Sequence, residues 1–138
     1  MQPKSLQILL IEDDAIEVMK LNRTIASLNL PHKIIEANNG EEALHILEKK
    51  TSLPDIILLD LNMPKINGIE FLSILKNDEI LKYIPTIILT TSSNKKDLLE
   101  CYKIGVAGYV LKPLKYEEYV LKIQNLLGYW SMNELMAL

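Results

Sequence analysis

The stretch that decides the fold runs from Pro54 to Gly68 and reads PDIILLDLNMPKING. Its apolar run, Ile56 to Leu59, is typical of a short strand buried on both faces, and we expect the strand to extend from Asp55 to Asp60. Asp60 would then place a carboxylate at the carboxyl end of a buried strand. Because burying a charge costs several kcal/mol unless another group compensates it, the sequence predicts that other parts of the chain supply partners for Asp60.

The composition is that of one ordinary globular domain. The chain has 138 residues, of which 49% are hydrophobic and 24% are charged, and this length suits a single domain. Its 18 acidic and 15 basic residues leave a net charge of −3, so we expect neither direct nucleic-acid binding nor attachment to a membrane. The single cysteine, Cys101, excludes an internal disulfide and favours a cytoplasmic location.

Short apolar runs alternate with helical patterns along the chain. The predicted strands are Leu6–Ile11, Lys33–Ala37, Asp55–Asp60, Thr86–Thr90 and Ala107–Leu111. Two predicted helices begin after Asp14 and Asn39, which are candidate N-caps. Three more are predicted at Gly68–Asn77, Lys95–Ile104 and Tyr116–Leu127, and Gly128 ends the last periodic pattern. We therefore expect five strands and five helices in alternation.

This alternation predicts an α/β fold. Parallel strands joined by right-handed helical crossovers form a sheet that is covered by helices on both faces. The best match is a flavodoxin-like, doubly wound (βα)5 fold with a five-stranded parallel sheet in the order 2-1-3-4-5, which places a site where the winding reverses. We expect residues 1–128 to form this domain and residues 129–138 to form a C-terminal tail.

The ends of four predicted strands carry reactive side chains. Glu12 and Asp13 follow the first strand, Asp60 ends the third, Thr90 ends the fourth and Lys112 follows the fifth. Carboxylates that lie close together repel by about 4 kcal/mol per pair at 4 Å and an effective dielectric constant of 20. Either their pKa values rise or a cation lies among them, and a set of oxygen ligands favours Mg²⁺ over Zn²⁺.

A hard dication beside a carboxylate is an arrangement for phosphoryl transfer. Asp60 could attack phosphorus as a nucleophile, while Lys112 and the metal neutralise the phosphoryl oxygens. Thr90 could donate a hydrogen bond to a phosphoryl oxygen. The strand order predicts that these groups converge, and their convergence would favour this chemistry.

Four motifs together resemble the response-regulator receiver family. They are IEDD at 11–14, LDLNMPKING at 59–68, LTTS at 89–92 and GYVLKP at 108–113, and the resemblance covers the chain roughly from Leu6 to Gly128. Each motif is weak alone, but the set is specific because the order and spacing are those of the family. The resemblance implies the flavodoxin-like fold and a role in two-component signalling.

The resemblance also implies a role for each acidic position. Asp60 corresponds to the phosphoacceptor of the family, which receives its phosphoryl group from a histidine kinase or a histidine phosphotransfer protein. Glu12 and Asp13 resemble the acidic pair that binds Mg²⁺ together with Asp60. Asn62 would contribute its main-chain carbonyl to the metal, and its side chain occupies a position that tunes dephosphorylation.

Further roles follow from the motifs after the fourth and fifth strands. Thr90 and Tyr109 resemble the switch pair of the family, and Lys112 resembles its phosphate-binding lysine. Ser92 occupies a second position that the resemblance links to dephosphorylation. The family usually has a cis peptide bond before Pro113, so we expect one here.

The leading hypothesis is a single-domain two-component response regulator. Phosphorylation of Asp60 would switch binding of an output protein, which the sequence does not identify, at the face formed by Lys95–Ile104, Ala107–Leu111 and the last helix. The apolar tail, Tyr129–Leu138, would continue the last helix, fold back onto its own domain, or act as an arm for homodimerisation. Its Tyr-Trp pair resembles single-domain regulators associated with bacterial phytochromes.

Two other functions remain open at this point. A Mg²⁺-dependent phosphohydrolase that works through an aspartyl phosphate would use the same site, but Asp60-Leu61-Asn62 lacks the second acid of an Asp-x-Asp motif. A flavin carrier is disfavoured because Glu12, Asp13 and Asp14 would repel phosphate where a flavodoxin-like carrier binds it.

Overall fold

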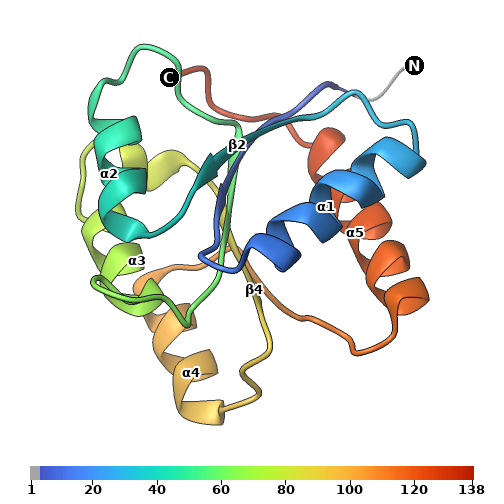
Figure 1. The fold of residues 1–138 in the computed structure, drawn as a ribbon. Helices are drawn as coiled ribbons and strands as arrows, with labels where there is room; N and C mark the ends of the chain where they lie inside the picture. The colour runs from blue at the N-terminus through green and yellow to red at the C-terminus, as the bar shows by residue number, and fades with distance from the viewer. Residues whose placement is uncertain (1–3) are drawn as a thin grey trace.

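The sheet has the predicted order. The computed structural model describes residues 4–138, and these contain one five-stranded parallel sheet in the order β2-β1-β3-β4-β5. Figure 1 shows α1 and α5 on one side of the sheet and α2, α3 and α4 on the other. The fold is therefore the doubly wound α/β arrangement expected from the alternation of strands and helices.

The strands and helices follow each other without a long interruption. The strands are β1 (Gln7–Ile11), β2 (Lys33–Ala37), β3 (Ile56–Leu59), β4 (Thr86–Thr90) and β5 (Gly108–Leu111). The helices are α1 (Ala15–Ser27), α2 (Gly40–Glu48), α3 (Gly68–Lys76), α4 (Lys95–Ile104) and α5 (Tyr116–Ser131), with a 3-10 turn, η1 (Leu81–Tyr83), before β4. None of the described helices combines the length and the apolar character needed to cross a membrane.

Strand β3 is buried on both faces. Ile56 and Leu58 pack into the core beneath α1 and α5, while Ile57 and Leu59 pack into the core beneath α2, α3 and α4. Successive side chains of a strand point to opposite faces, so a strand in the middle of a doubly covered sheet must be apolar at every position. This explains the unbroken apolar run and leaves Asp60 as the first polar residue after it.

Side-chain caps set the starts of the first four helices. Asp14 accepts a hydrogen bond from the Ile16 N–H, and Asn39 accepts one from the Glu42 N–H, as predicted for both caps. Asn67 and Asn94 cap α3 and α4 in the same way. Each cap accepts a hydrogen bond from a backbone N–H that has no partner within the helix, and so fixes the residue at which the helix begins.

The last helix is longer than predicted. Gly128 lies inside α5, which ends at Ser131, so the helix end predicted at Gly128 is wrong, whereas the prediction that the tail continues the last helix holds as far as Ser131. The buried Ser131 hydroxyl donates to the Gly128 carbonyl at 2.9 Å, and Trp130 and Leu135 pack against the core beneath α1 and α5. This packing offsets the cost of about 1 kcal/mol that a glycine brings to a helix interior.

A second local expectation is also wrong. The described residues contain no cis peptide bond, so the bond before Pro113 is trans.

Buried His32 gives the fold a predicted dependence on pH. Its Nδ1 accepts the Leu6 N–H at 3.0 Å, and burial lowers the pKa of His32. Below the ordinary histidine pKa of about 6.5, His32 takes up a proton in the unfolded chain but not in the folded chain. The free energy of unfolding should therefore fall as the pH falls from about 6.5 towards the pKa of His32 in the folded protein.

Urea denaturation at a series of pH values measures this effect. We expect His32→Gln to lose the contribution of His32, so that its free energy of unfolding falls less than that of the wild type as the pH drops below about 6.5. His45→Gln, at an exposed position on α2, is the matched control and should keep it. Equal pH dependence in both variants would contradict a role for His32.

Candidate functional site

The register of the central strands brings acidic residues to one edge of the sheet. Ile11 of β1 pairs with Leu59 of β3, so the residues that follow them, Glu12 and Asp60, are neighbours. The Asp60 N–H donates to the Ile11 carbonyl at 3.1 Å, and the Glu12 N–H donates to the Ala37 carbonyl of β2 at 3.0 Å. These backbone bonds hold both acidic residues at the carboxyl edge of the sheet.

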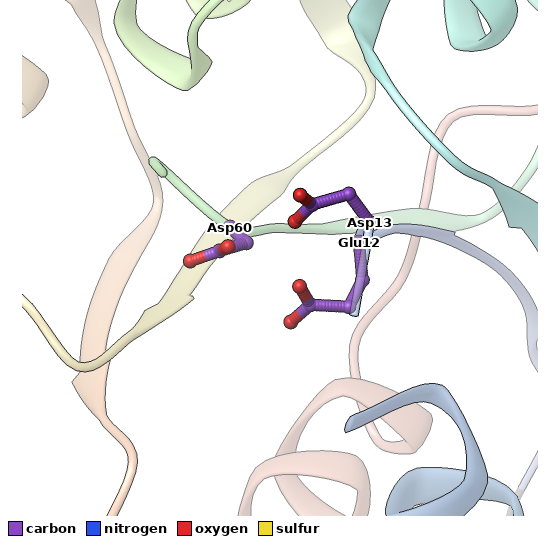
Figure 2. Close-up of side chains that lie close together, drawn as sticks. All are labelled: Glu12, Asp13 and Asp60. Atoms are coloured by element: carbon purple, nitrogen blue, oxygen red, sulfur yellow. The ribbon is translucent and has the colours of Figure 1, made fainter. Parts of the chain in front are cut away.

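Three carboxylates meet at this edge. Glu12, Asp13 and Asp60 each offer an oxygen, and these three oxygens all lie within 4.8 Å of one another. Figure 2 shows the three side chains converging on a common space. Glu12 and Asp60 are 3% and 8% exposed, whereas Asp13 is exposed. The convergence that the strand order predicted is therefore present.

Burial perturbs the two inner carboxylates. It raises the pKa of Glu12 to about 7, although Lys112 acts in the opposite direction. Burial also raises the pKa of Asp60, against the lowering effects of the Lys112 charge and of the Asn62 N–H. The raised pKa values mean that the surrounding groups do not fully stabilise the negative charges of Glu12 and Asp60. A bound cation would stabilise these charges, so the site attracts one.

Lys112, which follows the edge strand β5, supplies the positive charge of the site. The backbone N–H of Lys112 donates to the Thr90 carbonyl at 2.8 Å, so Lys112 lies just after β5 and beside the end of β4. Its ammonium lies 2.6 Å from Glu12 Oε1 and 3.7 Å from Glu17 Oε2. Burial alone would lower the pKa of Lys112, but its hydrogen bond with Glu12 and the negative charges of Glu12, Asp60 and Glu17 together raise it.

The cleft above the strand ends has room for a small ligand. Its volume is about 260 Å³, and its lining residues are Glu12, Asp13, Asp14, Glu17, Asp60, Asn62, Thr91 and Lys112. Sequence reasoning placed all of the predicted metal-binding residues and Lys112 here. It missed Glu17, which lies in the first turn of α1 after the Asp14 cap. Nothing in the sequence distinguishes Glu17 from an ordinary acidic residue of a helix start.

The loop after Asp60 is held in place by a close backbone approach. The Gly68 N–H donates to the Leu61 carbonyl at 3.0 Å. A Cβ at Gly68 would lie 2.6 Å from Leu61 Cα and 2.7 Å from the Asp60 carbonyl oxygen. Only glycine fits so closely against backbone. This contact closes the loop that carries Asn62 over the site.

The predicted switch residues lie on β4 and β5. Thr90 is fully buried at the end of β4, and its Oγ1 accepts the Ser92 N–H at 3.2 Å. Half-buried Tyr109 donates its hydroxyl to the Ser92 carbonyl at 2.8 Å. The Ser92 hydroxyl itself donates to Asp97 of α4 at 2.9 Å. Thr90, Ser92 and Tyr109 are thus connected, and the connection ties β5 to the start of α4.

Comparisons with known proteins agree with this architecture. Residues 8–124 match the family model described as the response regulator receiver domain. The probable methanogenesis regulatory protein FilR2 of Methanothrix harundinacea is 36% identical over 127 residues, which are 89% of this chain and 82% of that protein. The response regulator Rcp1 of Synechocystis sp. is 30% identical over 128 residues, 89% of this chain and 87% of Rcp1.

Solved structures are similar over almost the whole chain. The crystal structure of the phosphorylated cyanobacterial phytochrome response regulator RcpA has a TM-score of 0.90 at 31% identity, covering 96% of this chain and 99% of that one. The Mn²⁺-bound form of Rcp1 has a TM-score of 0.88 at 30% identity with the same coverage. By its fold, its strand-end carboxylates and these similarities, the chain belongs to the response regulator receiver domain family.

Proposed function

We propose that the protein is a single-domain response regulator that accepts a phosphoryl group on Asp60 from phosphohistidine. Receiver domains are phosphoacceptor signalling domains, and the chain is one of them. The observation that carries the proposal is the position of Asp60, at a strand end beside Glu12, Asp13 and Lys112.

The residues at this site fit a divalent cation. Three carboxylate oxygens within 4.8 Å of one another form an oxygen-only donor set, which suits Mg²⁺ or Mn²⁺. Glu12, Asp13 and Asp60 would hold the ion, with the main-chain carbonyl of Asn62 as a further ligand. When bound, Mg²⁺ would supply positive charge that stabilises the phosphoryl oxygens.

The chain's own groups perform the transfer. A carboxylate oxygen of Asp60 attacks phosphorus, the P–O bond forms as the P–N bond to the donor imidazole breaks, and the imidazole takes up a proton. Lys112 stabilises the charge on the phosphoryl group. In the later release step, water attacks phosphorus and Asp60 leaves as a carboxylate, giving inorganic phosphate.

Phosphorylation would be read out on the face formed by α4, β5 and α5. The doubly charged phosphoryl group replaces the single charge of the Asp60 carboxylate, which adds about one negative charge. Thr90 would respond because it lies next to Asp60, and Tyr109 of β5 would respond because both residues are hydrogen-bonded to Ser92. Exposed Leu99, Tyr102 and Leu121 provide apolar contacts there for an output protein. Asn62 lines the cleft, and we propose that it and Ser92 tune the lifetime of the phosphorylated state.

Transfer from a phosphohistidine donor tests the proposed function. Purified protein is mixed with Mg²⁺ and a panel of autophosphorylated histidine kinases and phosphotransfer proteins, and labelling is followed over time. We expect rapid labelling by at least one donor in the panel. The cytoplasm is the proposed compartment, since the donors act there and the one cysteine, Cys101, is a free thiol.

The phosphohydrolase alternative predicts a different result with the same protein. A hydrolase would turn over a general phosphate ester such as p-nitrophenyl phosphate many times, whereas a receiver domain would be labelled about once and then slowly lose phosphate. Repeated ester turnover without stable labelling would replace the proposed function with the alternative.

We further propose that two copies of the chain associate through the end of α5. Tyr129 is 56% exposed and Met132 is 75% exposed. Tyr129 and Trp130 also line an apolar groove of about 600 Å³ beside the open edge of β5. Aromatic and methionine side chains are enriched at protein interfaces, which supports a homodimer at this position.

Point variants test the homodimer without disturbing the core. Tyr129→Ser combined with Met132→Ser should shift the sedimentation coefficient to that of a monomer at concentrations where the wild type sediments as a dimer. Ile74→Ser, an exposed apolar position on α3, is the control and should leave it unchanged. Identical sedimentation of all three proteins would contradict the proposed dimer.

A further inference from the structure

Lys112 has a buried ammonium that depends on carboxylates for compensation. Its side chain is 6% exposed, and the described residues offer it two ion-pair partners, Glu12 at 2.6 Å and Glu17 at 3.7 Å. A buried charge left without a partner is strongly destabilising. The position of this ammonium is therefore set by the carboxylates that remain free to pair with it.

Glu12 is committed to more than one contact. Its Oε1 pairs with Lys112, and its Oε2 accepts the Asp14 N–H at 3.3 Å. It also belongs to the set of three carboxylates that fits a cation. Glu12 cannot bind a cation at full strength and remain the main counter-ion of Lys112, because the cation and the ammonium compete for the single negative charge of one carboxylate.

Glu17 has an unused acceptor at the right place. Among the residues that the structure describes, its Oε2 is buried and accepts no hydrogen bond. Two ammonium groups flank this oxygen, Lys112 at 3.7 Å and Lys20 at 3.6 Å, both just beyond hydrogen-bond distance. A movement of less than about 1 Å by the Lys112 side chain would give it a hydrogen bond of ordinary length to Glu17.

We propose that Glu17 is a positioning residue that takes over Lys112 when a cation occupies Glu12. This inference rests on the proposed function, because it assigns Lys112 to the phosphoryl group. Glu17 forms the ion pair with the Lys112 ammonium and keeps it inside the cleft while Glu12 binds the cation. It also removes Lys112 from competition for Glu12, so it strengthens cation binding without touching the cation or the phosphoryl group.

The Lys112 ammonium itself gives the most direct readout. Nitrogen-15 NMR of lysine ammonium groups detects those that are held by hydrogen bonds and protected from exchange with water. In the wild type we expect the Lys112 signal to persist, shifted, when Mg²⁺ saturates the site. In Glu17→Gln it should be present without Mg²⁺ and broaden beyond detection with it. Persistence of the signal in saturated Glu17→Gln would overturn the proposal.

Mg²⁺ affinity provides a second readout, measured by titration calorimetry on the full chain. We expect the Kd for Mg²⁺ to rise about fivefold in Glu17→Gln, the upper range for a partly exposed charge pair. Glu48→Gln removes the same charge from an exposed position at the end of α2 and should leave the Kd within about 1.5-fold of the wild type.

A double variant separates positioning from a general charge effect. In the Lys112→Met background, Glu17→Gln should change the Kd for Mg²⁺ by less than about 1.5-fold, because the residue through which Glu17 acts is gone. An undiminished fivefold effect in that background would overturn the proposal. If instead the wild type bound Mg²⁺ but accepted no phosphoryl group from any donor, the proposed function would fail while the Glu17 result could still stand.

Discussion

Replacing Asp60 with Asn is expected to abolish Mg²⁺-dependent labelling by phosphohistidine or acetyl phosphate. The amide has nearly the same shape as the carboxylate but lacks the nucleophilic oxygen that forms the P–O bond. It also removes one of the three carboxylates that fit the cation. Label incorporation, measured after a fixed time with saturating donor, should fall to the level of a reaction without protein.

Loss of labelling in this variant should not reflect unfolding. Burial raises the folded-state pKa of Asp60, so the ionised carboxylate disfavours folding at pH values above its unfolded pKa. The amide of the Asp60→Asn variant carries no charge, and we expect the variant's free energy of unfolding near neutral pH to equal or exceed that of the wild type.

A matched control is available at the other end of the same strand. Asp55 Oδ2 accepts the Gln7 N–H at 2.7 Å, and an amide oxygen can accept the same bond. Asp55→Asn should be labelled like the wild type. Labelling that persists in Asp60→Asn would move the acceptor to another carboxylate, and Asp13 would be the first candidate.

Among substitutions of the glycines by alanine, Gly68→Ala should cause the largest loss of stability. The added Cβ would lie 2.6 Å from Leu61 Cα and 2.7 Å from the Asp60 carbonyl oxygen, and both are backbone atoms that cannot rotate away. Such overpacking costs about 1–3 kcal/mol. Because the shift falls on the residue bonded to Asp60, phosphorylation should also slow.

Gly128→Ala is the control for this change. A Cβ at Gly128 meets nothing within 4 Å, and Ala is favoured over Gly in a helix interior by about 0.8–1 kcal/mol. Urea denaturation should therefore show Gly68→Ala to be less stable than the wild type and Gly128→Ala to be more stable. A Gly68→Ala variant as stable as the wild type would show that the loop has room to move.

The features that sequence reasoning predicted correctly depend on local chemistry or on strand order. The unbroken apolar run before Asp60 indicated a strand covered on both faces, and the caps Asp14 and Asn39 indicated where helices begin. Parallel pairing then placed Glu12 beside Asp60. Each of these follows from the residue itself and from its distance along the chain to the next element.

The features that it did not predict depend on tertiary contacts. The sequence left open whether the tail continues the last helix, and the packing of Trp130 and the buried Ser131 decide in favour of continuation past Gly128. The primary partner of Lys112 is Glu12, and its second partner, Glu17, is a helix residue whose proximity depends on how α1 leaves β1. Such partners emerge only when the elements are assembled.

Locating the phosphoryl group by peptide mapping tests the central claim most directly. The wild-type protein is phosphorylated with Mg²⁺ and a phosphohistidine donor, digested under conditions that preserve acyl phosphates, and analysed by tandem mass spectrometry beside a sample prepared with a chelator. We expect the modification on Asp60 alone, and only in the sample with Mg²⁺. A phosphoryl group on Asp13 or on a histidine, or equal modification in the chelated sample, would contradict the account.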